Sequence, residues 1–453
     1  MSEVVLVDGV HNYSNAQDYV PPKSKEVQEH LKWFTGLKLG LMMHFAPESQ
    51  LGICESWPLS NGDADWSRED IDWTDDMDEF KQQYINANKT FNPVKFRPDE
   101  WAKLAKDCGF KYLLFTTKHH DGFCMYDTKT TTYKITDPSC PFHTHKYADM
   151  VKHLYEAFRK EGLAISTYFS KPDWHSNYYW CDQFPEAETR NVNYDIEKHP
   201  DIWNKFVEYT HEQITELTSN YGKVDVLWLD GGWVEPNNLH QDIRLGEIVE
   251  KIRSTTQPHL IVCDRTVGGE YENIITPEQT VPDAIIDVPW ESNITLGDGF
   301  SYRYCDHYKT GRTLVHKLLD VVSKGGNLAL NIAPQPDGKL PKNGVDSLRQ
   351  LGSWLKVNGD GIYETKAYKN TTDKNVVYTQ KNGVVYAFYL FDEVPSFFRT
   401  VYLTIDKPVK RIELLRNHQQ IPFTQNGSTV EIHTHDINMM EAKYSDCFQL
   451  FFE

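Results

Sequence analysis

Residues 223–232, KVDVLWLDGG, are the stretch of sequence that decides the fold. The apolar run 224–229 is short and nearly continuous, which is typical of a strand buried on both faces of a parallel sheet. Asp230 ends the run, and the two glycines after it leave space around its carboxylate. In a parallel barrel, reactive side chains lie just past the carboxyl ends of the strands. The segment therefore predicts a buried parallel strand with a candidate acidic group at its end.

Similar apolar runs alternate with helical patterns from about residue 30 to residue 360. The other expected strands are 39–44, 112–117, 163–169, 260–263, 284–287 and 328–332. The expected helices are 98–108, 147–161, 201–221, 238–254, 311–323 and 345–358. Strand–helix alternation of this length favours a parallel sheet with both faces covered. The number of units fits an α/β fold of the (β/α)8-type barrel class, which need not be regular.

The pattern changes after about residue 365 to short strands separated by turn signals. The expected strands there are 375–380, 384–390, 400–405, 411–415, 429–433 and 448–452. Such a series predicts a small all-β sandwich. We therefore expect two domains, a catalytic barrel over residues 1–362 and a C-terminal β-sandwich over residues 363–453. For the acidic insertion at 58–90 we expect a solvated loop, with a wall of the cleft as the alternative.

The charge and the apolar pattern exclude two classes of partner. The chain carries 47 Lys and Arg against 65 Asp and Glu, a formal charge of −18, so it should repel nucleic acid. There is no run of 18 or more apolar residues, and we expect no membrane span. Residues 1–22 lack the pattern of a signal peptide. The compartment stays unknown: cytoplasmic as written, or periplasmic, secreted or lysosomal if a signal was removed. The oligomeric state is also left open.

Aromatic residues make up 13% of the chain, with 12 Trp and 25 Tyr, which suits a sugar-binding cleft as well as a core. Five expected strands end in polar or ionisable side chains, and these are His44, His119 with His120, Tyr168, Asp230 and Arg265. Because the carboxyl ends of parallel strands gather at one edge, we expect these side chains to meet in one cleft.

Asp230 is the sharpest catalytic candidate. An aspartate held ionised in a Trp-lined pocket is a good nucleophile towards an anomeric carbon. Retaining glycoside hydrolysis needs a second carboxyl group about 5 Å away as acid/base. Spacing alone does not choose among the downstream candidates Glu270, Glu272, Glu278 and Glu291.

Structural roles compete with each of these interpretations. Asp230 alone suits a turn or helix cap, and Arg265 suits an ion pair with Asp264. The two adjacent histidines suggest a metal-dependent hydrolase with Asp230, but neighbours on an extended chain point in opposite directions. We therefore favour hydrogen bonds from His119 and His120 to sugar hydroxyls.

Together these strand ends resemble the α-L-fucosidases of glycoside hydrolase family 29. The resemblance extends from Trp33 to Tyr363. It rests on LGLMMHFAP at 39–47, FNPVKFRPDEWAKLAKDCGFKYLLFTTKHHDGF at 91–123, LAISTYFS at 163–170, VDVLWLDGGW at 224–233, DRTVGGEYENIITPEQ at 264–279 and GGNLALNIAPQPDGKLP at 325–341. It implies a barrel with a C-terminal β-sandwich. It also implies retaining hydrolysis of terminal α-L-fucosides through a covalent fucosyl-enzyme intermediate, without metal or cofactor.

The resemblance assigns roles to individual residues. Asp230 matches the nucleophile, and the positions that match fucose-binding residues are His44, His119, His120, Tyr168 and Arg265, with Trp228 in the pocket wall. For the acid/base, Glu278 looks like the position of one branch, and Glu291 resembles the Trp-Glu segment of others; Glu278 is preferred. The implied substrate is a fucosylated oligosaccharide or glycoconjugate.

Two departures flank the implied pocket. The family usually has His-Trp-Gly where this chain has His44-Phe45-Ala46, and it usually has Glu and Trp adjacent where Ser56 here separates Glu55 from Trp57. Glu55 and Trp57 are carried as substrate-binding candidates. A non-catalytic fucose-binding protein on the same scaffold is the remaining alternative.

Overall fold

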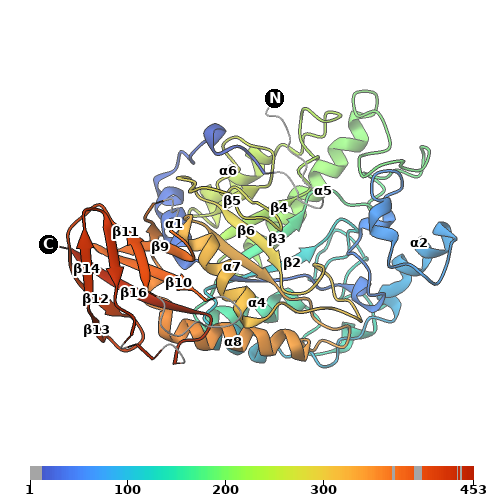
Figure 1. Ribbon diagram of the computed structural model, residues 1–453. Coiled ribbons are helices and arrows are strands. Elements are labelled where there is room, and N and C mark those ends of the chain that lie inside the picture. Colours follow the sequence, from blue (N-terminus) through green and yellow to red (C-terminus); the bar gives the residue numbers. More distant parts are fainter. Residues whose placement is uncertain (1–12, 370–372, 392–399, 436, 439–440, 453) are drawn as a thin grey trace.

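The computed structural model describes residues 13–369, 373–391, 400–435, 437–438 and 441–452. Its larger part is a curled sheet of seven parallel strands in the order β5-β4-β3-β2-β1-β7-β6, with helices packed around it (Figure 1). The strands are β1 (Leu39–Met43), β2 (Tyr112–Lys118), β3 (Ala164–Ser170), β4 (Val226–Asp230), β5 (Ile261–Asp264), β6 (Glu291–Thr295) and β7 (Asn327–Asn331).

The helices that cover this sheet are amphipathic, and several begin with a side-chain cap. Ser24, Asp149 and Thr310 each accept a hydrogen bond from a backbone N–H in the first turn, at the starts of α1, α4 and α7. The helices are α1 (Lys25–Leu37), α2 (Met77–Asn86), α3 (Pro98–Asp107), α4 (Met150–Lys160), α5 (Pro200–Ser219), α6 (Leu245–Thr255), α7 (Gly311–Ser323) and α8 (Lys342–Asn358).

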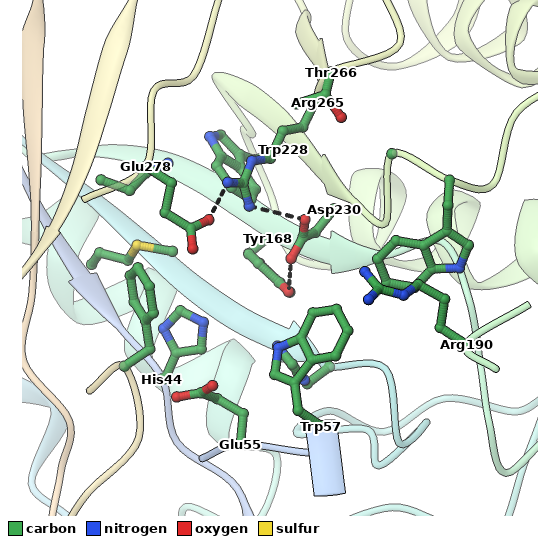
Figure 2. Close-up of a pocket in the computed structure, with 16 residues that line it drawn as sticks. His44, Glu55, Trp57, Tyr168, Arg190, Trp228, Asp230, Arg265, Thr266 and Glu278 are labelled. Carbon is green, nitrogen blue, oxygen red and sulfur yellow. Dashed lines mark hydrogen bonds and ion pairs between the residues drawn. The ribbon is translucent and has the colours of Figure 1, made fainter. Parts of the chain in front are cut away.

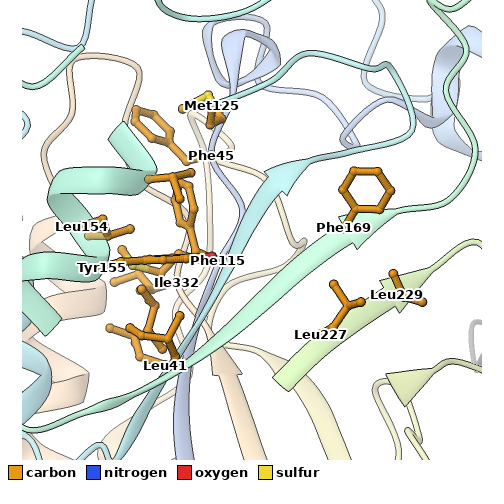
Figure 3. Packing of buried hydrophobic residues seen from close by; sticks show 14 of the residues in the cluster. Leu41, Phe45, Phe115, Met125, Leu154, Tyr155, Phe169, Leu227, Leu229 and Ile332 are labelled. Carbon is orange, nitrogen blue, oxygen red and sulfur yellow. The ribbon is translucent and has the colours of Figure 1, made fainter. Parts of the chain in front are cut away.

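Alternation along each strand separates two buried layers. Leu41, Phe115 and Leu227 face outwards and pack against the helices, where Leu154 and Tyr155 of α4 cover β2 (Figure 3). The inward positions form a second cluster, closed at the amino-terminal end by α1. That cluster contains Val27, Leu31, Phe34, Met42, Tyr112, Leu114, Tyr168, Val226, Trp228, Ile261, Cys263 and Ala329.

Gly40 shows how tightly this interior is filled. A Cβ atom there would lie 2.0 Å from the ring of Tyr112, because that ring crosses the barrel directly over the glycine backbone. The Tyr112 hydroxyl can then reach Glu291 on β6. The interior of the barrel is therefore filled by packed side chains at the amino-terminal ends of the strands and is polar at their carboxyl ends.

The barrel is open between its two edge strands, β5 and β6. The segment between them makes isolated bridges to both, through Cys263–Glu272 on one side and Ile275–Trp290 and Glu278–Asn293 on the other. This segment occupies the position of an eighth strand and carries Glu278 to the sheet edge. The predicted barrel is thus realised in an irregular, seven-stranded form.

The C-terminal part is antiparallel, as predicted. One sheet has the order β13-β12-β16-β10-β9-β8 and a second has the order β11-β15-β14, with a separate apolar core between them. The strands are β8 (Lys366–Ala367), β9 (Val376–Lys381), β10 (Val384–Leu390), β11 (Val401–Thr404), β12 (Val409–Leu414), β13 (Gln420–Ile421), β14 (Phe423–Asn426), β15 (Thr429–Ile432) and β16 (Ser445–Phe452).

Three expectations about individual elements are wrong. Residues 284–287 form no strand. Strand β6 begins at Glu291, and its polar sequence ESNIT lacks the apolar run that marks the other strands. α6 begins at Leu245 rather than near 238, since Leu239, His240 and Arg244 have positive φ. The acidic insertion contains α2, whose Phe80 and Tyr84 are buried. No helix in the described ranges is long and apolar enough to cross a membrane.

Candidate active site

A cavity of about 260 Å³ lies where the carboxyl ends of the strands meet (Figure 2). Its walls come from strand ends and from the loops that follow them. The lining residues are Met42, His44, Glu55, Trp57, His119, Tyr168, Arg190, Trp228, Asp230, Gly232, Trp233, Arg265, Thr266, Glu278, Asn293 and Phe300. The structure thus brings most of the predicted site residues together. His120 and three of the four candidate acid/base glutamates, Glu270, Glu272 and Glu291, do not line the cavity.

Asp230 is held by three donors at the end of β4. Its Oδ2 accepts a hydrogen bond from the Tyr168 hydroxyl at 2.6 Å, and its Oδ1 accepts from the backbone N–H of Gly231 at 2.9 Å and from Nη1 of Arg265 at 3.1 Å. Burial raises the pKa of this carboxyl, but the charge of Arg265 and the Tyr168 hydrogen bond outweigh it and hold the pKa well below the usual range. Asp230 is therefore ionised at neutral pH.

The turn after Asp230 requires glycine. Gly231 has φ 85°, and a Cβ atom on it would lie 2.3 Å from Pro172. The sharp turn directs the chain away from the carboxylate and leaves its oxygens facing the cavity.

Arg265 joins the two carboxylates of the cavity. Its Nη1 contacts Asp230 and its Nη2 forms an ion pair with Glu278 (Figure 2). The guanidinium also lies over the ring of Trp228, 5.5 Å from the ring centroid. Because a planar guanidinium presents its donors in a rigid fork, it fixes the spacing between Asp230 and Glu278.

The other acidic candidates lie elsewhere. Glu270 pairs with Lys23 at the surface, and Glu272 accepts hydrogen bonds from Ser14 and from the backbone N–H groups of Thr266 and Gly268. Glu291 is buried beneath Trp228, whose Nε1 donates to it at 3.2 Å, and it also accepts from Tyr112. Only Glu278 among these four lines the cavity.

Glu291 predicts a pH-dependent stability. Burial raises its pKa to about 7, against 4.5 for an ordinary glutamate, despite hydrogen bonds from Tyr112 and Trp228 that lower it. Between pH 4.5 and 7 this glutamate stays protonated in the folded state and ionises in the unfolded state. The free energy of unfolding of the wild type therefore falls by up to about 3 kcal/mol as the pH rises through this range. We expect Glu291→Gln to unfold at a higher temperature than wild type at pH 8, with a smaller or no gain at pH 5. Calorimetry at both pH values measures this, and an equal effect at both would contradict it.

His44 and His119 are neutral and oriented by buried partners. Burial lowers the pKa of His44 to about 4, and its Nδ1 pairs with Oδ1 of Asn331 at 2.9 Å. Burial also lowers the pKa of His119 well below its usual value, and its Nδ1 pairs with the Ser56 hydroxyl at 2.7 Å. In each ring the other nitrogen remains for a ligand. The serine that separates Glu55 from Trp57 thus orients a histidine of the cavity.

His120 stands behind the cavity wall. Its Nδ1 contacts Ser170, and its Nε2 lies 3.9 Å from Oδ2 of Asp230. The rings of His119 and His120 are 4.1 Å apart, so the expectation that they point in opposite directions is wrong; β2 ends at Lys118 and the alternation stops there.

His119, His120 and Asp230 bring possible ligand atoms within 4.8 Å of one another, so their spacing fits a metal ion. The carboxylate, however, already accepts hydrogen bonds from Tyr168, Gly231 and Arg265. A guanidinium 3.1 Å from Oδ1 would repel a second cation, and the donor set therefore fits an ion poorly.

The sequence profile of the α-L-fucosidase family matches residues 7–360. The chain belongs to this family. The plasma α-L-fucosidase of Rattus norvegicus is 26% identical over 91% of this chain and 89% of its own length. The tissue α-L-fucosidase of Homo sapiens is 28% identical over 68% of this chain and 64% of its own length. The predicted family and its fucosidase activity, a retaining glycoside hydrolysis, are therefore confirmed.

Solved structures of α-L-fucosidases share the fold. Isoenzyme 1 from Paenibacillus thiaminolyticus superimposes with a TM-score of 0.77 and 27% identity, covering 95% of this chain and 100% of that one. The Thermotoga maritima α-fucosidase in complex with a mechanism-based inhibitor gives 0.75 and 26% over the same shares. The predicted combination of a barrel-type sheet and a C-terminal β-sandwich is confirmed.

Several lining residues of this α-L-fucosidase family member were not predicted as site residues from the sequence. Alternation points to Met42, two residues before His44, and to Asn293, two residues after Glu291. Arg190, Trp233, Thr266 and Phe300 come from loops, for which no periodicity exists. Arg190 lies over the rings of Trp57 and Trp233, 4.8 and 5.2 Å from their centroids, and Asp63 of the acidic insertion holds it at 2.5 Å.

Proposed function

We propose that the protein releases terminal α-L-fucose from fucosylated oligosaccharides or glycoconjugates by double displacement, with Asp230 as nucleophile and Glu278 as acid/base. One observation carries this proposal: both carboxylates face the same cavity and are held by the two Nη atoms of Arg265. Retaining enzymes use two carboxyl groups about 5 to 5.5 Å apart, a spacing that suits two acids on one guanidinium. Comparing wild type, Asp230→Asn and Glu278→Ala on an aryl α-L-fucoside tests it; near-normal turnover in either variant contradicts that assignment.

In the first step, a carboxylate oxygen of Asp230 forms a bond to the anomeric carbon while the bond to the leaving oxygen breaks. Glu278, which acts here in its protonated form, gives its proton to that oxygen, and the leaving group departs as an alcohol. Glu278 has to turn from Arg265 towards the glycosidic oxygen to do so. Tyr168 keeps its proton, because burial raises the pKa of its hydroxyl well above the usual value, and it orients Asp230 throughout.

In the second step, Glu278 takes a proton from water, and the water oxygen attacks the same carbon. The bond to Asp230 breaks, the nucleophile returns as a carboxylate, and the two inversions give net retention. Arg265 remains next to Asp230 and stabilises the negative charge that returns to this carboxylate as its bond to the sugar breaks.

The sugar is placed by the floor of the cavity. His44 and His119, both neutral, offer ring nitrogens to sugar hydroxyls, and Tyr168 and Trp228 present stacked rings whose centroids lie 5.3 Å apart. Met42 and Phe300 add apolar surface that suits the methyl group of fucose. His120 supports this floor through Ser170 and Asp230 without lining it.

The leaving group of the substrate has to lie at the mouth of the cavity. Trp57, Trp233 and Arg190 are lining residues that stay partly exposed, and they form one side of this mouth. The carboxylate of Asp63 accepts from Nε and from the backbone N–H of Arg190, and its backbone oxygen accepts from Nη2, which leaves Nη1 for a ligand. We assign to Trp57, Trp233 and Arg190 the binding of the leaving-group sugar, since aromatic faces with one hydrogen-bond donor are typical of sugar recognition.

Arg190→Met tests this assignment because it keeps the packing over the two tryptophans and removes the donors. We expect kcat/KM for a fucosylated disaccharide to fall about 10-fold, the loss of one charge-assisted hydrogen bond, with aryl fucoside turnover within about twofold. Arg349→Met, an exposed change on α8, is the matched control. An equal fall on both substrates would place Arg190 in general support of the cavity instead.

All residues assigned here lie within 1–362, which we propose as the catalytic domain. Residues 363–453 are then an accessory β-sandwich packed against α7 and α8, with Tyr386, Phe388 and Cys447 in the shared apolar cluster. No role in the chemistry is assigned to this part.

A further inference from the structure

A second cluster of ionisable side chains lies at the opposite end of the barrel from the catalytic cavity. Asp225 directly precedes β4, His259 lies two residues before β5, and His30 belongs to α1. Asp225 and Asp230 bracket the same strand, so about 16 Å of extended chain separates the two sites. No residue of this cluster lines the catalytic cavity.

The three side chains converge on one point. Nε2 of His30 lies 2.9 Å from Oδ1 of Asp225, and the rings of His30 and His259 meet edge to face with centroids 4.7 Å apart. One ligand atom from each of the three residues lies within 4.8 Å of the others. In a tetrahedral zinc site such atoms lie roughly 3.4 Å apart. Side-chain rotations that move the ligand atoms by about 1 Å would bring the three to this spacing.

Two features go beyond a simple ion pair. Nε2 of His259 is buried and has no hydrogen-bond partner in the described structure, although a buried ring nitrogen is normally satisfied. Oδ2 of Asp225 accepts from the backbone N–H of Ile165 at 2.9 Å, which fixes the carboxylate with Oδ1 towards the histidines.

Lys223 competes for the same oxygen. Its ammonium lies 2.7 Å from Oδ1 of Asp225, but its side chain is 50% exposed and can turn into solvent. A bound cation would displace the Lys223 ammonium and replace it as the positive partner of the Asp225 carboxylate. Nitrogen, nitrogen and carboxylate ligands with an open fourth position suit Zn²⁺ or a similar divalent transition metal, not Mg²⁺ or Ca²⁺.

We propose that His30, Asp225 and His259 form a zinc-type metal site that fastens α1 to the amino-terminal ends of β4 and β5. Such a site has a structural role and is independent of fucoside hydrolysis. Because α1 closes the interior of the barrel at this end, metal bound here stabilises the folded chain by mass action.

Calorimetric titration of the intact protein with Zn²⁺ tests the site, with the double variant His30→Gln/His259→Gln for comparison. We expect one Zn²⁺ per wild-type chain and at least 10-fold weaker binding in the double variant. Lys223→Met should bind more tightly than wild type, since it removes the competing ammonium. Added Zn²⁺ should raise the melting temperature of wild type but not of the double variant. His307→Gln, an exposed histidine elsewhere, should behave as wild type.

The metal-site proposal and the hydrolysis proposal can fail independently of each other. Fucosidase activity should survive EDTA and both histidine substitutions, which also shows that the double variant folds. No Zn²⁺ binding by wild type, or unchanged binding by the double variant, would overturn the site. Weaker binding in Lys223→Met would show that Asp225 is an ordinary ion-pair partner.

Discussion

Replacing Asp230 by Asn should lower turnover of an aryl α-L-fucoside by about 10³-fold or more, a loss of at least about 4 kcal/mol of transition-state stabilisation. The amide keeps the shape of the side chain and a hydrogen bond from Tyr168 or Arg265. It removes the negative charge that those groups stabilise, and with it the nucleophile. Steady-state kinetics on wild type and variant measure the effect.

The fold of the variant has to be checked separately, because Asp230 and Arg265 form a buried ion pair. Asp107→Asn, on the exposed end of α3, is the matched control and should keep full activity. Asp230→Gly with azide sharpens the test: azide takes the place of the carboxylate, and β-fucosyl azide should form in one inverting step. If wild-type activity survives in Asp230→Asn, the mechanism assigned to this carboxylate is wrong.

Glu278→Ala should lower turnover about 10²- to 10⁴-fold for a substrate with a poor leaving group. With an aryl fucoside whose phenolate leaves without protonation, the rate of the first step should fall less, and the fucosyl-enzyme should accumulate. Azide should restore its turnover and give the α-azide, because azide attacks that intermediate without needing a base. Kinetics with leaving groups of graded acidity, and product analysis, measure both effects.

Glu291 supplies the comparison for Glu278. Its carboxylate accepts from Tyr112 and Trp228 behind the cavity wall, so Glu291→Gln should keep turnover within about 10-fold and show no azide effect. Azide rescue confined to the alanine variant of Glu291 would reverse the assignment of the acid/base. Rescue of neither would remove both residues from that role.

Most of the barrel and half of the site follow from local pattern. The run VDVLWLD places Trp228 and Asp230 on the inward face because strand side chains alternate, and the same rule places Tyr168 and His44. The bounds of helix α7 were predicted to the residue, since Thr310 and the apolar stripe after it are local signals. Elements whose inward side chains are polar, such as β6, lack that signal and were missed.

Only the tertiary structure shows which of Glu278 and Glu291 lies next to Asp230. Both follow Arg265 in the sequence, and both are buried. Only the bridges of residues 272–279 to the edge strands bring Glu278 to the guanidinium of Arg265, while the strand β6 turns Glu291 under Trp228. Arg190 was equally invisible, because a loop residue acquires its position from Asp63, more than a hundred residues away in sequence.

The sequence by itself determined six of the seven parallel strands and the ionisable groups at their ends, and its motifs gave the resemblance to the family. The strands and their ends depend on alternation and spacing within single segments, which the order of residues records directly. Tertiary structure alone decided which carboxylate lies next to Asp230 in the cavity, how His119 and Ser56 pair, and that the distant side chains of Asp225 and His259 converge on His30. Each of these is a contact between separate segments, whose distance is set by how the whole barrel packs and not by any local preference of the chain.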